Sequence, residues 1–147
     1  MAESSRRNTI RILIVEDNRG DVVLVREAFK EAGIDFDLTH MSDGEQALRY
    51  LHRVASGAEA ERPDVVLLDL NLPKRNGWEL LDAIRRSPTL ASTPVVILSS
   101  SGNPEDAERA ARTPFSIYIR KPCTLDEFLD IGRQIEEFRS GASADQL

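Results

Sequence analysis

The amino-acid sequence predicts an α/β fold in which one parallel sheet of five strands is covered by helices on both faces. Short apolar runs alternate with helical patterns five times along the chain, an order typical of a doubly wound sheet. Two of the apolar runs are continuous, as in strands that are buried on both faces. The length of 147 residues, with 41% hydrophobic and 30% charged residues, suits one globular domain.

Five apolar runs are expected to form the strands. They are Ile10–Val15, Phe36–Met41, Val65–Leu68, Val95–Leu98 and Ser116–Ile119. The third and fourth runs are apolar throughout, which favours central positions in the sheet. The second run alternates between apolar and polar residues, which is typical of an edge strand.

A helical pattern follows each apolar run. We expect helices over residues 17–32, 42–54, 76–86, 104–112 and 124–139. Gly33 marks the end of the first helix, and Thr124 with Glu127 has the spacing of a capping box at the start of the last. Five strands joined by such helices suit the flavodoxin-like strand order 2-1-3-4-5.

The composition limits where the chain acts and what it binds. No stretch approaches the roughly 18 apolar residues of a membrane-spanning helix, and the opening MAESSRRNT has no apolar region like that of a signal peptide. We therefore expect a cytoplasmic protein that does not enter a membrane. The net charge of −6 argues against non-specific binding of nucleic acid, which needs a basic surface.

Polar residues follow four of the five apolar runs. Glu16 and Asp17 follow the first run, Asp69 the third, Ser99 the fourth and Lys121 the fifth. Ligands of open α/β sheets bind at the carboxyl ends of the strands. In the order 2-1-3-4-5 these four strands are neighbours, so the five side chains are expected to meet in one crevice.

Such a crevice has the chemistry needed to transfer a phosphoryl group onto a carboxylate. Three carboxylates in one place repel one another and favour Mg²⁺, which takes few carboxylates together with waters and phosphate oxygens. The Lys121 ammonium and the Ser99 hydroxyl can stabilise the oxygens of the phosphoryl group.

Four motifs at these strand ends resemble those of the receiver domains of two-component response regulators. They are LIVEDN, VVLLDLNLPKRNG, VILSSS and YIRKP. The resemblance covers about Ile10 to Phe138 and implies a CheY-like fold. We place the receiver domain at residues 10–139, with a flexible N-terminus at 1–9, a surface loop at 55–63 and a C-terminal tail at 140–147.

The resemblance also implies a role for each site residue. Asp69 corresponds to the phosphoacceptor, and Lys121 to the lysine that pairs with the phosphoryl group. Five further positions match: Glu16 and Asp17 as Mg²⁺ ligands together with Asp69, Asn71 as a ligand through its backbone carbonyl, Ser99 as the switch hydroxyl, and Tyr118 as the aromatic that changes rotamer. Pro122 corresponds to a proline that follows a cis peptide bond. The acidic pair is Glu-Asp here, where the family more often has Asp-Asp.

The implied function is signalling rather than enzymatic turnover. A sensor histidine kinase would phosphorylate Asp69, and the output would be a changed contact with another protein, including a histidine phosphotransfer protein. Residues 16–34 and 43–51 resemble single-domain regulators that partner bacterial phytochrome histidine kinases. The apolar stripe of the last helix, from Leu125 to Phe138, indicates either core packing or a homodimer through this helix and the tail.

One enzymatic alternative is a phosphatase of the haloacid dehalogenase type, which also uses an aspartyl nucleophile. Such enzymes usually carry a second Asp two residues after the nucleophile, and Asn71 stands at that position. Their other acids also come late in the chain, whereas Glu16 and Asp17 come early. A nucleotide-binding protein is disfavoured because the chain has no glycine-rich phosphate loop.

Overall fold

The computed structural model describes residues 9–57, 62–74 and 76–145 and confirms the predicted sheet. The five strands are parallel and lie in the order β2-β1-β3-β4-β5. The flexible N-terminus expected at 1–9 falls outside the described residues except for Thr9. Of the loop expected at 55–63, residues 58–61 lie outside the described residues, and Ala55 and Ser56 belong to the helix Gly44–Ser56.

Three of the strands have the predicted bounds. They are β1 (Ile10–Val15), β2 (Phe36–Met41) and β3 (Val65–Leu68). The other two, β4 (Val95–Ser99) and β5 (Ser116–Arg120), each continue one residue further than predicted. The extension follows from strand pairing, because Ser99 and Arg120 are partners in the β4–β5 ladder.

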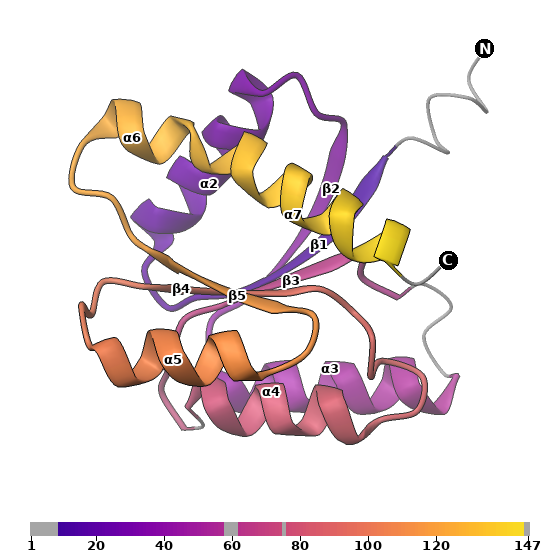
Figure 1. Cartoon of the computed structure of the whole chain (residues 1–147). Helices are drawn as coiled ribbons and strands as arrows, with labels where there is room; N and C mark the ends of the chain where they lie inside the picture. The colour runs from indigo at the N-terminus through magenta and orange to yellow at the C-terminus, as the bar shows by residue number, and fades with distance from the viewer. Residues whose placement is uncertain (1–8, 58–61, 75, 146–147) are drawn as a thin grey trace, which may run out of the picture.

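Helices cover both faces of the sheet. Figure 1 shows α2 (Arg19–Glu31), α6 (Leu125–Leu129) and α7 (Ile131–Asp145) on one face. The other face carries α3 (Gly44–Ser56), α4 (Gly77–Arg86) and α5 (Pro104–Arg112). Five of these helices, α2 to α6 in chain order, begin after a polar residue whose side chain accepts a backbone N–H in the first turn. These N-caps are Asn18, Asp43, Asn76, Asn103 and Thr124.

The last predicted helix differs from expectation in two ways. Asp130 divides it into α6 and α7, because its N–H bonds to the Glu127 carbonyl in a tighter turn and its carboxylate accepts from Arg133 and Gln134. In addition, α7 continues to Asp145, into the segment expected to be a tail. Alanines in this segment favour the helical conformation.

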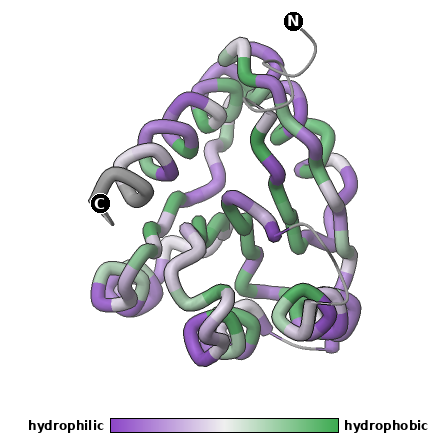
Figure 2. Tube along the Cα trace, turned by 90° about the vertical axis from the view of Figure 1, so that its right-hand side faces the viewer, coloured by the Kyte–Doolittle hydropathy of each residue, from purple (hydrophilic) through white to green (hydrophobic). Residues whose placement is uncertain are grey.

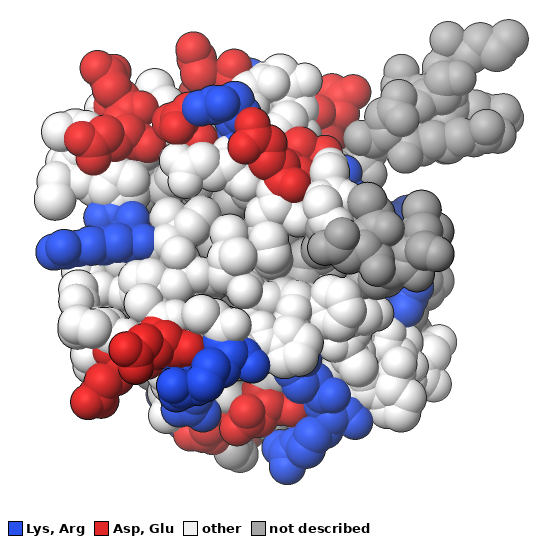
Figure 3. All heavy atoms as spheres, in the orientation of Figure 1, with Lys and Arg blue, Asp and Glu red and all other residues white. Residues whose placement is uncertain are grey.

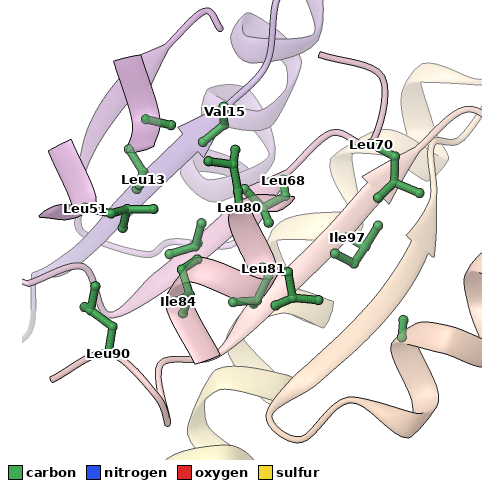
Figure 4. Packing of buried hydrophobic residues seen from close by; sticks show 14 of the residues in the cluster. Leu13, Val15, Leu51, Leu68, Leu70, Leu80, Leu81, Ile84, Leu90 and Ile97 are labelled. Atoms are coloured by element: carbon green, nitrogen blue, oxygen red, sulfur yellow. The ribbon is translucent and has the colours of Figure 1, made fainter. Parts of the chain in front are cut away.

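The sheet separates two apolar cores. Leu80, Leu81 and Ile84 of α4 pack onto Leu68 and Ile97 of the sheet in one core (Figure 4). The other core lies beneath α2, α6 and α7. In Figure 2 the strands are mainly hydrophobic, whereas hydrophobic and hydrophilic residues alternate along the helices, as expected for helices with one buried face.

The apolar stripe of the last helix belongs mostly to this second core. Phe128, Ile131 and Ile135 are buried there, and Phe138 packs against it. Leu125 is the exception, since 58% of its surface is exposed. Most of the apolar excess is therefore explained by packing within the chain.

The expected cis bond before Pro122 was wrong. The described residues contain no cis peptide bond, so Lys121 and Pro122 are joined in the trans form, which is intrinsically favoured even before proline. Among the described helices, none has the length and apolar character needed to cross a membrane.

The contact between α7 and α2 generates a prediction. A Cβ atom on Gly132 would lie 2.4 Å from the backbone oxygen of Ala28, so Gly132→Ala must force the two helices apart. We expect the free energy of unfolding to fall by about 1–3 kcal/mol in a urea titration.

Gly141→Ala in the same helix is the matched control. A Cβ at Gly141 meets nothing within 4 Å. This variant should be as stable as the parent protein or up to about 1 kcal/mol more stable. Equal stability of the two variants would contradict the close approach of α7 and α2.

Candidate functional site

Backbone hydrogen bonds place the predicted site residues at the carboxyl ends of the strands. The Glu16 N–H donates to the Met41 carbonyl at 3.0 Å, and the Asp69 N–H donates to the Val15 carbonyl at 3.1 Å. On the other side of β4, the Lys121 N–H donates to the Ser99 carbonyl at 2.8 Å. These bonds continue the ladders by one residue and hold each site residue directly beyond its strand.

Three carboxylates form the candidate metal site. One oxygen each from Glu16, Asp17 and Asp69 can be chosen so that all lie within 4.8 Å of one another. Glu16 is 2% exposed and Asp69 is 8% exposed, whereas Asp17 is open to solvent. Oxygen donors around a partly open position are what Mg²⁺ and Mn²⁺ accept, because water can complete the coordination. The residues present therefore fit a divalent cation.

Asp69 is fixed from two sides. Its Oδ1 accepts the backbone N–H of Asn71 at 3.0 Å, and its Oδ2 lies 3.4 Å from Lys121 Nζ. Ligation by the backbone carbonyl of Asn71, which the resemblance implied, stays a prediction.

Lys121 is bound by more carboxylates than the sequence indicated. Its Nζ lies 2.6 Å from Glu16 Oε1, 2.8 Å from Asp21 Oδ2 and 3.4 Å from Asp69 Oδ2. The lysine side chain is only 11% exposed. Burial opposes its charge, but the hydrogen bonds to Asp21 and Glu16 outweigh that effect and hold the pKa of Lys121 above its ordinary value.

For Glu16, burial has a larger effect on the pKa than the pairing with Lys121. Burial raises the pKa of this carboxyl, Lys121 lowers it, and the neighbouring Asp69 raises it again, with the result that it lies at about 7. Without a cation, a proton on Glu16 therefore relieves part of the repulsion in the site near neutral pH.

The two predicted switch residues are linked through the backbone of Ser101. The Ser101 N–H donates to the Ser99 hydroxyl at 3.2 Å, and the Tyr118 hydroxyl donates to the Ser101 carbonyl. Ser99 is completely buried, while Tyr118 is half-buried. A movement of the Ser99 hydroxyl would thus be felt by Tyr118 through Ser101.

Two other residues support the site: Gly77, which the family resemblance places in the loop after the phosphoacceptor, and His40, whose contact with the site was not identified from the sequence. A Cβ on Gly77 would lie 2.6 Å from the Asp69 backbone oxygen, so only glycine lets α4 begin this close to Asp69. His40 Nε2 lies 2.7 Å from the Glu16 carbonyl and ties β2 to the metal site. The position of His40 at the end of β2, one strand away from Glu16, was the available signal.

Comparisons with known proteins agree with this geometry. A family model described as response regulator receiver domain matches residues 12–132. The response regulator Rcp1 of Synechocystis sp. is 36% identical over 127 residues, covering 86% of both chains. Two solved structures are each similar over 88% of this chain and 93% of their own. The phosphorylated cyanobacterial phytochrome response regulator RcpA is 39% identical, with a TM-score of 0.77. The Mn²⁺-bound form of Rcp1 is 35% identical, with a TM-score of 0.76.

The raised pKa of Glu16 predicts how cation binding depends on pH. A divalent cation binds the deprotonated carboxylate, so protons compete with it below a pH of about 7. Mg²⁺ affinity should fall about tenfold from pH 8 to pH 6, as followed by the fluorescence of Trp78, the single tryptophan of the chain.

Glu16→Gln is the control for this measurement. The variant should bind Mg²⁺ more weakly at every pH and lose most of the pH dependence, because the titrating group is gone. If the parent protein bound Mg²⁺ equally well at pH 6 and pH 8, Glu16 would not be the carboxyl that the cation and the proton share.

Proposed function

Because the chain belongs to the receiver domains of response regulators, we propose that it accepts a phosphoryl group from a sensor histidine kinase on Asp69. The geometry that carries this assignment is the position of Asp69 between the acidic cluster and the Lys121 ammonium, 3.4 Å from its Oδ2. One carboxylate is thereby held where positive charge can collect on both sides of an incoming phosphoryl group.

The chain's own residues account for the transfer. A carboxylate oxygen of Asp69 attacks the phosphorus of a phosphohistidine, the P–N bond breaks, and imidazole leaves with that electron pair as an acyl phosphate forms. Lys121 neutralises a phosphoryl oxygen, while the Asn71 N–H keeps the carboxylate in place. A divalent cation held by Glu16, Asp17 and Asp69 supplies further neutralisation of the phosphoryl oxygens.

The switch is proposed to run through Ser99 and Tyr118. The Ser99 hydroxyl turns from the Ser101 N–H toward the acyl phosphate, and the Ser101 backbone then shifts. Tyr118 follows, because its hydroxyl is bonded to the carbonyl of the same residue. The outcome is a change on the surface formed by α5, β5 and α6, where a partner protein would detect it.

The partner proposed is a histidine kinase of the phytochrome type, acting in the cytoplasm. Support comes from the similarity to RcpA and Rcp1, of which the first is described as a phytochrome response regulator. A histidine phosphotransfer protein is a second proposed partner, because it offers the same imidazole chemistry as the kinase.

A homodimer through the last helix and the tail is supported by one exposed apolar residue. Leu125 remains exposed on α6, but the rest of the stripe packs within the chain. We keep the homodimer as a proposal that rests on this residue.

Two other functions receive less support. The family match favours a signalling receiver over a haloacid dehalogenase phosphatase. The face in Figure 3 carries mainly acidic side chains over α6 and α7 and mixed charges over α5, with no continuous basic patch. Neither this face nor the net charge of −6 offers the basic surface that non-specific binding of nucleic acid needs.

Asp69→Asn tests the proposed function. The amide cannot form the acyl phosphate, so incubation with acetyl phosphate and Mg²⁺ should give no labelling at this site, whereas the parent protein gains one phosphoryl group by mass spectrometry. Asp64→Asn, just before the opposite end of β3, is the control and should be labelled like the parent. Labelling of Asp69→Asn would exclude Asp69 as the acceptor.

Leu125→Glu tests the homodimer. If α6 forms the contact, this charge should convert a dimer into a monomer in light scattering, while Val23→Glu, 56% exposed on α2, should leave the dimer intact. A parent protein that is monomeric with and without phosphorylation would refute the homodimer.

A further inference from the structure

Asp21 contacts the proposed phosphoryl-binding lysine without being part of the metal cluster. Its Oδ2 lies 2.8 Å from Lys121 Nζ, closer than Asp69 Oδ2 at 3.4 Å. The three carboxylates that can surround one cation are Glu16, Asp17 and Asp69. Asp21 is therefore the one carboxylate bound to Lys121 that a cation does not need.

The hydrogen-bonding capacity of the ammonium makes this contact important. Lysine has three N–H donors, and the three carboxylates Glu16, Asp21 and Asp69 can accept all of them. When a cation binds Glu16 and a phosphoryl group modifies Asp69, two of these acceptors are engaged elsewhere. Asp21 then remains as the acceptor that can fix the position of Lys121.

A simpler explanation for Asp21 is its place in the first turn of α2. An acidic residue there is favourable for any helix because of the helix dipole. That explanation does not require a side chain that is 22% exposed and directed at a lysine 100 residues away in sequence. The position of the α2 N-terminus is itself fixed, since the Asn18 side chain accepts the Asp21 N–H at 3.2 Å.

We propose that Asp21 is a positioning residue, which holds the Lys121 ammonium beside Asp69 and limits its competition with the cation for the Asp69 carboxylate. The proposal deepens the proposed function and rests on it for the role of Lys121 in phosphoryl transfer. Without Asp21, the ammonium would keep its 2.6 Å contact with Glu16 and could also move closer to Asp69, from which it is held 3.4 Å away. Mg²⁺ would then have to displace it from both.

The experiment is a double-mutant cycle between Asp21→Asn and Lys121→Met, read out by Mg²⁺ affinity from Trp78 fluorescence. Asp21→Asn alone should weaken Mg²⁺ binding roughly tenfold, the size expected for one charge-assisted hydrogen bond. In the Lys121→Met background the same change should have little effect, because no ammonium is left to compete. Labelling by acetyl phosphate should be slower in Asp21→Asn and recover in Asp21→Glu.

Glu27→Gln is the matched control, since it removes the same charge from α2 at a side chain that is 52% exposed. It should leave Mg²⁺ affinity and labelling unchanged, and thermal unfolding should show that every variant is folded. Equal losses from Asp21→Asn with and without Lys121 would overturn the proposal, as would parent-like Mg²⁺ affinity in Asp21→Asn. Failure of the parent protein to be labelled would instead count against the proposed function and leave the Mg²⁺ result to decide on Asp21.

Discussion

The repulsion among Glu16, Asp17 and Asp69 is the constraint that shapes the rest of the site. At a separation of about 4 Å, two unit charges cost on the order of 4 kcal/mol at an effective dielectric constant of 20. Two features of the chain reduce this repulsion. One is the buried Lys121 ammonium, which several carboxylates bind, and the other is the Glu16 carboxyl, whose pKa lies at about 7. A divalent cation would reduce the repulsion further, so a proton, the lysine and the cation compete for the same carboxylate oxygens.

The sheet makes this concentration of charge tolerable. The strands that end at Ser99 or directly before Glu16 and Asp69 are almost entirely buried, and their ladders fix where each strand ends. Stability of the fold comes from the two apolar cores on either side of the sheet. The acidic edge of the sheet can therefore contain carboxylates that repel one another, because the apolar cores and not this edge determine the fold.

Sequence patterns predicted the sheet and the convergence of the three carboxylates with Lys121, because continuous apolar runs ending in a charged residue are a strong local signal. They did not reveal Asp21, since its contact with Lys121 depends on the direction of one helical turn against a distant strand. The division at Asp130 was missed because the apolar stripe continues across it. The apolar stripe of the last helix also indicated a partner surface, but the burial of Ile131 and Ile135 within the chain explains most of that stripe.

The link between Ser99 and Tyr118 uses only main-chain atoms of Ser101. Any amino acid with an amide hydrogen can preserve that connection, whereas proline would sever it. The side chain at position 101 can therefore change without cutting the path between the two switch residues. Its hydroxyl is then left to another task, since it accepts the Asn103 N–H just before α5.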